Sequence, residues 1–283
     1  MKKEKYKRNK KKTNRKKIKK DYKVNKIVLI IISLLVLLLV FILIVKLNKP
    51  KNKTNESLFI ETVENNDELI TDIGKRSYDY ELELANIADK KIGDIVRYGN
   101  YYINNNSEKE NVEWIILDKN EISKEVILLS KYVLERKKFN DLYEPILWQN
   151  SDIRKWLSKD FYNALFSEQE KTYILNGEIK NDNYLNYNTI KGSSTYDRIY
   201  LPSFDDVKNY MGDDILSANG TKYFKEIGGY VDKNGKADWW LRTNGDIQYD
   251  IMYILAKGEI NLNGDYSITD DIGVRPMIKI KYK

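Results

Sequence analysis

The sequence predicts an α+β domain, with a mostly antiparallel sheet and two or three helices, that follows a single transmembrane helix. Residues 27–45 form one uninterrupted apolar run. Within residues 92–283, short β-branched segments come first and last, and segments with helical spacing of apolar residues lie between them. Strands that precede and follow a group of helices are typical of α+β folds.

The apolar run contains no charged residue and a single hydroxyl, that of Ser33. As a helix with a rise of about 1.5 Å per residue it is roughly 28 Å long, close to the hydrocarbon thickness of a bilayer. A cleavable signal peptide has a shorter apolar region, of about 7–15 residues, and a cleavage site of small residues. Residues 46–50 read Lys-Leu-Asn-Lys-Pro and offer no such site. We therefore expect an uncleaved signal-anchor in the cell membrane.

Residues 1–26 are expected to form a basic cytoplasmic tail. They carry fifteen Lys or Arg and two acidic residues, and such a cluster beside a membrane span stays cytoplasmic. The large C-terminal part is then outside the cell. A basic tail at this place also contacts anionic membrane lipid. Nucleic-acid binding is not expected, because the tail has no folded-motif signature and its only aromatic residues are Tyr6 and Tyr22.

The composition excludes several classes of function. The chain of 283 residues contains no Cys and no His. Disulfides, thiol nucleophiles, histidine-dependent catalytic triads and the usual zinc sites are therefore excluded. Outside the basic tail the chain holds thirty-four basic and forty acidic residues, so this larger part is acidic. Its stability must come from a hydrophobic core, for which about 190 residues suffice.

Residues 46–91 are interpreted as a linker or stalk. The first part, up to about Ser57, is rich in Lys and Asn and suits a flexible spacer. The rest is acidic, with scattered apolar residues that include Leu82, Leu84 and Ile87. This part is expected to be helical in two pieces that are interrupted near Gly74. Its apolar positions are too sparse for a sustained coiled coil.

The compact domain is expected to begin at Ile92. Residues 112–118 and 125–130 are short β-branched runs on either side of a charged turn, which predicts a β-hairpin. Ser151 is a good N-cap, and apolar residues then recur at helical spacing as far as Leu165. Residues 167–170 read Ser-Glu-Gln-Glu, a capping box that predicts a shorter helix ending at Asn176-Gly177.

The second half of the domain is expected to return to strands. Residues 178–198 are polar and predict a long surface excursion. Residues 199–201 form a short strand, and a helix that starts after Pro202-Ser203 ends at Gly212. Four further strands are predicted, separated by turns that contain Gly: residues 239–242, 251–255, 259–262 and 274–280.

Several ordered blocks in this domain resemble a bacterial surface domain of unknown function, the family numbered six-two-seven-three. The resemblance covers about residues 92–280. The family usually continues Trp-Leu-Arg with Ser-Pro, whereas Thr243-Asn244 stand here, so this loop is expected to differ in shape. The blocks are Gly93-Asp94 with Tyr98-Gly99, Glu113-Trp114, Leu129 to Tyr132, Ser151 to Leu157, Trp239 to Arg242 and Gly273 to Pro276.

A more distant resemblance is to the C-type-lectin-like fold, including its sulfatase-modifying-factor branch. In that fold a Leu-Pro-Ser/Thr step opens a helix, a Trp-rich strand follows and a Gly-x-Arg strand closes the domain. Residues 200–203, 239–240 and 273–275 match these steps in the same order. The resemblance implies a C-type-lectin-like α+β fold. The activity of the enzymatic branch depends on cysteines, which are absent here, and is not implied.

Candidate ligand-binding residues are Trp239, Trp240, Arg242 and Arg275. Neighbouring residues of a strand face opposite sides, so one tryptophan is expected in the core and the other is a candidate for stacking on a sugar or peptide. Packing of both in a central strand is the favoured alternative. The two arginines are candidates to clamp an anion, or else to pair with a buried carboxylate such as Asp238 or Glu113.

A calcium site is a further candidate. Oxygen ligands suitable for calcium occur on Asn261, Asn263, Asp265, Asp270 and Asp271, but their spacing matches no fixed calcium loop. Turn chemistry explains Asn and Asp at these positions and is the favoured interpretation. No other cofactor is expected.

The function predicted from the sequence is non-catalytic recognition outside the cell, with a cell-wall glycan, a host glycan or a surface protein as the partner. Two alternatives stay open. A surface hydrolase that uses a pair of carboxylates is compatible with the many acidic residues, but no motif selects the pair. A structural or sensory membrane subunit, whose tail binds a cytoplasmic partner, is the other.

Overall fold

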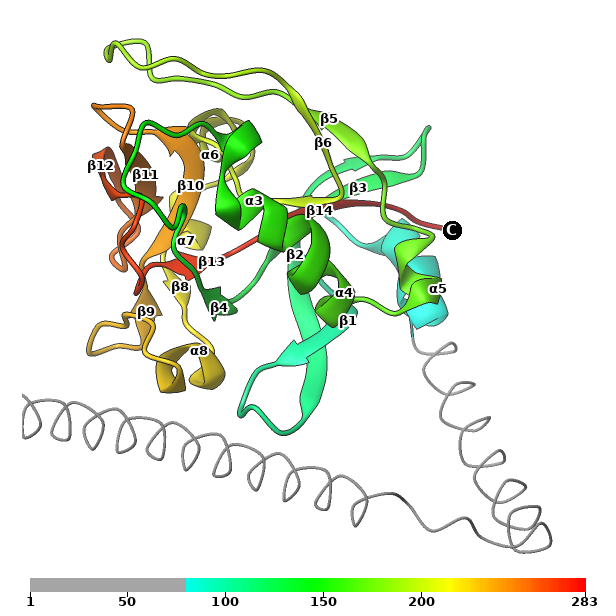
Figure 1. The fold of residues 1–283 in the computed structure, drawn as a ribbon. Coiled ribbons are helices and arrows are strands. Elements are labelled where there is room, and N and C mark those ends of the chain that lie inside the picture. Colours follow the sequence, from blue (N-terminus) through cyan, green and yellow to red (C-terminus); the bar gives the residue numbers. More distant parts are fainter. Residues whose placement is uncertain (1–79) are drawn as a thin grey trace, which may run out of the picture. The chain divides into compact units, whose positions relative to one another are not determined.

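The structure, a computed structural model, describes residues 80–283 and has a mixed α+β fold (Figure 1). Among these residues, two five-stranded sheets have the orders β1-β2-β3-β14-β7 and β12-β11-β10-β13-β4. The strands of the first sheet are β1 (Ile95–Tyr102), β2 (Lys109–Asn120), β3 (Glu125–Ser130), β14 (Met277–Lys281) and β7 (Ile199–Tyr200). Those of the second sheet are β12 (Ile260–Tyr266), β11 (Asp250–Ile254), β10 (Trp239–Asn244), β13 (Gly273–Val274) and β4 (Glu135–Arg136). Two small ladders join β5 (Gly177–Ile179) to β6 (Thr195–Asp197), and β8 (Ala218–Asn219) to β9 (Lys236–Ala237).

The predicted hairpin over residues 112–130 is confirmed. Strands β2 and β3 pair antiparallel, with Trp114 opposite Ser130, and a bulge lies between Ile116 and Asp118. Strand β14 pairs with the other edge of β3, with Met277 opposite Leu129. The C-terminal strand therefore lies inside the first sheet. Every ladder within this sheet is antiparallel.

The predicted final strand over residues 274–280 is in fact two strands that belong to different sheets. Strand β13 pairs parallel with β10, with Trp239 opposite Gly273, whereas β14 pairs antiparallel with β3. Arg275 and Pro276 form the step between them. Proline has no N–H to donate, so a continuous ladder cannot run through this position. The step joins the two sheets, as the red segment in Figure 1 shows.

The strongest predicted helix is present. It begins at Ser151, whose hydroxyl accepts the backbone N–H of Arg154, and runs through α3 (Asp152–Trp156), the π-helical turn η3 (Leu157–Phe161) and α4 (Tyr162–Leu165). Ile153, Leu157 and Phe161 are buried against the first sheet's core cluster. The apolar stripe read from the sequence is therefore a core face.

Other helices are short. The capping box at Ser167 and Glu170 is confirmed, but α5 (Glu168–Lys171) ends well before Asn176. The reason is that Leu175 donates its N–H to the Lys279 carbonyl, which draws the chain to the sheet. Helix α6 (Phe204–Tyr210) is confirmed with its cap at Ser203. The prediction of two or three helices missed α7 (Asp213–Leu216), α8 (Lys222–Glu226) and the single turns η1 (Ile87–Asp89) and η2 (Trp148–Asn150).

The excursion predicted over residues 178–198 is a long arm with a paired base. Strands β5 and β6 hold its two ends together, with Ile179 opposite Thr195. Residues 180–194 continue from this base toward the end of the second sheet (Figure 1). Leu185 and Ile190 of the arm are exposed.

The folded part begins before Ile92. Residues 80–86 are helical, and the side chains of Leu84 and Ile87 are fully buried in the core. The end of the predicted stalk is therefore packed against the domain. The predicted tail, membrane span and most of the stalk lie outside the described residues. Within residues 80–283, no helix has the length and apolar character needed to cross a bilayer.

Candidate functional site

Three tyrosines from separate segments of the chain meet at the end of the second sheet. Tyr143 follows β4, Tyr249 precedes β11 and Tyr266 ends β12. The ring centroid of Tyr143 lies 5.2 Å from that of Tyr249 and 5.1 Å from that of Tyr266. We call these three residues the tyrosine surface.

The tyrosine surface is open to solvent. Tyr143 is 45% exposed and Tyr266 is 56% exposed. The same loops also expose Leu142 and Ile247. Grouped apolar side chains on a protein surface mark interaction sites, whereas single ones need no explanation. Among the exposed aromatic side chains of residues 80–283, Tyr143 and Tyr266 are the pair whose rings are in contact, and the half-buried Tyr249 lies beside Tyr143.

The backbone holds the three loops together. Ile146 donates its N–H to the Gln248 carbonyl at 3.0 Å, and Ser267 donates to the Tyr249 carbonyl at 3.2 Å. Asn244 is buried and its side-chain amide donates to the carbonyls of Ile146 and Gln248. The surface is thus preformed by hydrogen bonds beneath it. Asn244 is one of the two residues where the sequence departs from the family's usual Ser-Pro, and it lies within β10 rather than in a loop.

Negative charge surrounds the tyrosines. Burial raises the pKa of the Asp250 carboxyl, and the nearby charges of Asp246 and Asp265 raise it further. One carboxylate oxygen of Asp250, Oδ1, is buried and has no hydrogen-bond partner among residues 80–283. The pKa of the Tyr143 hydroxyl is raised, by desolvation and then by Asp250. No basic side chain is among the causes of either shift.

The arm lies against the same loops. The Tyr187 hydroxyl donates to Asn263 Oδ1 at 2.7 Å, and the Ile190 N–H donates to Gln248 Oε1 at 2.9 Å. The arm therefore covers part of the β12 edge beside the tyrosine surface.

The two predicted ligand-binding tryptophans are both in the core. Trp239 and Trp240 have no exposed surface. Their indole N–H groups donate to the carbonyls of Leu216 and Lys137, at 3.0 and 2.9 Å. The two rings do face opposite sides of β10, and each side is covered, because each tryptophan belongs to a different core cluster. The favoured interpretation, that both pack in a central strand, agrees with this burial.

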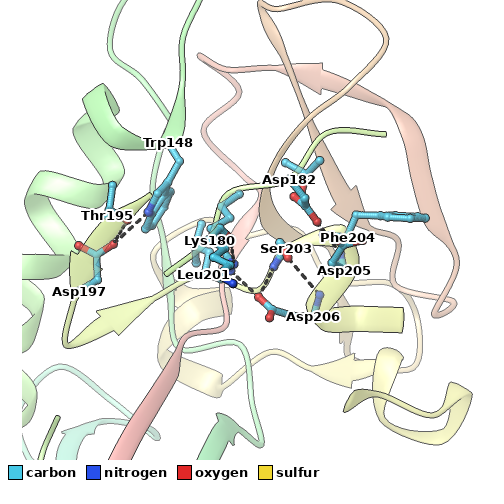
Figure 2. A network of polar contacts seen from close by, with 12 residues as sticks. Trp148, Lys180, Asp182, Thr195, Asp197, Leu201, Ser203, Phe204, Asp205 and Asp206 are labelled. Atoms are coloured by element: carbon cyan, nitrogen blue, oxygen red, sulfur yellow. Dashed lines mark hydrogen bonds and ion pairs between the residues drawn. The ribbon is translucent and has the colours of Figure 1, made fainter. Parts of the chain in front are cut away.

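Arg242 pairs with a carboxylate, although not with Asp238 or Glu113. Its guanidinium is an ion-pair partner of Asp206 and also donates to the carbonyls of Leu201, at 2.6 Å, and Lys180, at 3.0 Å. Figure 2 shows Lys180, Leu201, Ser203 and Asp206 close together at the centre of the view. The network fastens the arm and α6 to β10.

Arg275 forms no ion pair with a carboxylate of residues 80–283. It is buried, lies 4.9 Å from the centre of the Trp239 ring, and donates to the carbonyls of Ser130, at 2.9 Å, and Ile215, at 2.6 Å. Burial lowers the pKa of its guanidinium. Backbone carbonyls satisfy Arg275 because it lies in the step between the two sheets, where the ladders are interrupted. The structure does not bring Arg242, Arg275 and an exposed tryptophan to one surface.

Of the five candidate calcium ligands, Asn261 and Asp265 accept local hydrogen bonds, Asn263 accepts from Tyr187 of the arm, and Asp270 forms an ion pair. Asn261 accepts from the Gly264 N–H, and Asp265 accepts from the Tyr266 N–H and the Thr269 hydroxyl. Asp270 lies 3.8 Å from Arg136. In the part of the chain from residue 80 onward, no group of three or more acidic side chains is placed to hold a metal ion.

Carboxylates do approach one another at the start of α6. Asp182 accepts the Asp205 N–H at 2.6 Å and the Thr243 hydroxyl at 2.5 Å. Figure 2 shows Asp182 beside Asp205. Burial raises the pKa of the Asp205 carboxyl, and Asp182 and Asp206 add to this effect. Asp182 is thus committed to holding the arm on α6.

A separate concave region lies on the β1–β2 hairpin. It is a groove of about 490 Å³ lined by Arg97, Asn100, Ile103, Lys109, Glu110, Asn111, Glu113 and Tyr132. Its lining contains two basic side chains, Arg97 and Lys109, and two acidic ones, Glu110 and Glu113. Glu113 lies 3.9 Å from Arg97 and also forms an ion pair with the neighbouring Lys131 at 2.7 Å.

The sequence contains a weak signal for the tyrosine surface. Each tyrosine stands beside polar or turn-forming residues, in Asp-Leu-Tyr-Glu-Pro, Gly-Asp-Ile-Gln-Tyr-Asp or Asn-Gly-Asp-Tyr. In the structure Tyr143 and Tyr249 lie outside the strands, and Tyr266 is the last residue of β12. Only the fold shows that the three rings meet.

A family model described as a domain of unknown function, DUF6273, matches residues 123–282. The match begins in the β2–β3 turn and includes the tyrosine surface and the ion pair of Arg242 with Asp206. No curated protein matches the chain. No solved structure matches it either.

Proposed function

The chain belongs to the DUF6273 family of domains of unknown function, and we propose that it is a non-catalytic recognition protein anchored in the cell membrane. Residues 92–283 are presented outside the cell and bind a glycan or a surface protein. The tyrosine surface is the binding site. The fold is a C-type-lectin-like variant, an assignment that rests on the order of the Leu-Pro-Ser, Trp-Trp and Gly-Val-Arg steps in the sequence.

The single observation that carries this proposal is the preformed group of exposed tyrosine rings. Tyrosine is favoured in recognition surfaces because a rigid ring offers a large contact area and its hydroxyl also forms hydrogen bonds. Loops tied together at Ile146, Gln248 and Ser267 lose little conformational entropy on binding.

An array of glycans and surface peptides probed with the full-length chain tests the binding function. Binding to at least one class of ligand, lost in a variant with Tyr143→Ala and Tyr266→Ala, is expected. The matched control is Tyr196→Ala, because Tyr196 is 65% exposed and lies on β6, outside the tyrosine surface. Retained binding in the double variant would contradict the assignment of the site.

The anchored topology has its own test. Protease added to intact cells is expected to digest the C-terminal part and to leave a fragment that contains residues 1–45. A C-terminal part that resists protease until the cells are lysed would contradict the topology.

If the protein is a hydrolase, Asp205 is the residue to test first. The pKa of the Asp205 carboxyl is raised, as is typical of a general acid. Activity on a glycan that disappears in Asp205→Asn while binding persists would favour it.

The sensory alternative predicts that residues 1–26 retain a cytoplasmic partner in a pull-down. Calcium binding predicts a calcium-dependent rise in Tm that Asp265→Asn abolishes.

A further inference from the structure

The loops that carry the tyrosine surface hold unbalanced negative charge. Residues 141–147, 245–250 and 263–271 contain seven carboxylates and no Lys, Arg or His: Asp141, Glu144, Asp246, Asp250, Asp265, Asp270 and Asp271. Asp270 forms an ion pair with Arg136 at 3.8 Å. The other six carboxylates form no ion pair within residues 80–283. The ligand side of the surface is therefore acidic.

The groove on the β1–β2 hairpin provides a contrast within the same domain. There, Arg97 and Lys131 lie against Glu113 and neutralise it. At the tyrosine surface, Asp250 and Asp265 instead lie on the adjacent strands β11 and β12, with Asp250 opposite Tyr266 and Ile251 opposite Asp265. Among residues 80–283, neither of these two carboxylates nor Asp246 forms an ion pair, so like charges face one another there. A ligand that brings positive charge would relieve this repulsion, so the surface is complementary to a cation.

The tyrosine rings restrict the kind of cation. An ammonium group placed over an aromatic ring is attracted by the ring's negative face. The rings of Tyr143 and Tyr266 expose apolar area as well, which an isolated small cation does not use. A ligand that is flat, partly apolar and amine-bearing uses both features.

The arm disfavours an extended peptide. A peptide that adds a strand to a sheet needs a free edge. The edge of the second sheet nearest the tyrosine surface is β12, and Tyr187 of the arm contacts Asn263 on this strand. A ligand that rests on the ring faces avoids this obstruction.

We propose that the tyrosine surface binds a glycan whose sugar rings carry free amino groups. Tyr143 and Tyr266 receive the ring faces, and Asp246 and Asp265 attract the ammonium groups. This inference rests on the proposed recognition function and names its ligand class.

The test is a calorimetric titration of the full-length chain in detergent micelles with three oligosaccharides of equal length: β-linked glucosamine, its N-acetylated counterpart and a β-linked glucose oligomer. The expected result is an affinity for the glucosamine oligomer at least about tenfold above that for the other two, equivalent to about 1.4 kcal/mol. The advantage is expected to shrink as salt is added, because screening weakens interactions between exposed charges.

Two variants separate charge from stacking. Asp246→Asn combined with Asp265→Asn is expected to remove the tenfold advantage, and an asparagine at position 265 can still accept the Tyr266 and Thr269 hydrogen bonds. The matched control is Glu121→Gln, because the Glu121 side chain is 81% exposed and lies outside these loops, in the β2–β3 turn. Unchanged Tm in each variant shows that the fold is intact.

Equal affinity for the three oligosaccharides would overturn the inference and leave the recognition function standing. Tighter binding of hexalysine than of the glucosamine oligomer would overturn it in favour of a basic peptide. Failure to bind any oligosaccharide, together with an array ligand that the tyrosine variant loses, would overturn the ligand class alone. Failure on the array as well would overturn both.

Discussion

Aromatic and charged side chains occur together in two regions of this domain, with opposite outcomes. In β10, Trp239, Trp240 and Arg242 are buried, and most of their polar atoms have partners. At the tyrosine surface, Tyr143 and Tyr266 are exposed, and Asp270 is the one of the seven surrounding carboxylates that forms an ion pair within residues 80–283. The chemical character of a motif therefore does not identify a site. What identifies it is whether the fold has already satisfied the side chains.

Among the variants that test this comparison, Trp240→Ala is expected to lower the free energy of unfolding most. The ring is fully buried between Phe139 and Tyr253, so its loss leaves a cavity that costs about 3–5 kcal/mol. Denaturant unfolding followed by fluorescence measures the change. A loss below about 1 kcal/mol would show that the site tolerates truncation and that Trp240 is not a core residue.

Removal of the ion pair between Asp206 and Arg242, beneath the arm, is expected to cause the second-largest loss of stability. Asp206→Ala leaves the buried Arg242 guanidinium without its carboxylate, a change that costs about 3 kcal/mol when one partner of a buried pair is removed. The neighbouring Asp205→Asn is the control, and it is expected to be neutral or slightly stabilising at neutral pH because the Asp205 pKa is raised. Similar losses from the two changes in thermal unfolding would contradict a specific role for Asp206.

Gly264→Ala tests how the tyrosine surface is shaped from below. Gly264 has φ +85°, and a Cβ atom there would lie 2.8 Å from the Ile251 carbonyl carbon. The backbone must shift, and we expect a loss of about 1–3 kcal/mol together with displacement of Tyr266. Gly235→Ala is a matched control with φ +78° and open space around the added atom. Equal Tm values for the two variants would show that the close approach to β11 does not matter.

Asp250→Asn is expected to stabilise the domain slightly at pH 7. The folded-state pKa of Asp250 is raised, so ionisation favours the unfolded chain, and stability falls as pH rises from the ordinary value of about 3.9 toward the raised value. Asparagine does not ionise. The Tm difference between variant and parent should therefore appear above about pH 4 and vanish below it. A difference of the same size at pH 3 would point to packing rather than charge.

Tyr266→Ser should have the smallest effect on stability, within about 0.5 kcal/mol, because the side chain is 56% exposed. Loss of ligand binding without loss of Tm is the expected outcome. A large fall in Tm would mean that the tyrosine surface is a structural cluster, like the rings around Trp240.

Local sequence patterns predicted the local structure well. The cap at Ser151, the capping box at Ser167 and the β2–β3 hairpin depend on residues close together in the chain, and each is present. The end of α5 and the division of the last strand were mispredicted. Both depend on partners far away, since Leu175 contacts Lys279 and Gly273 pairs with Trp239. The tyrosine surface was missed for the same reason.

The sequence by itself determined the α+β class, the family, and the exclusion of cysteine and histidine chemistry, because composition and short-range periodicity contain this information. Only the tertiary structure decided which aromatic residues are buried and which meet at the surface. Burial depends on which strands and loops become neighbours, and this chain brings Tyr143 to Tyr249 and Tyr266 across more than a hundred residues.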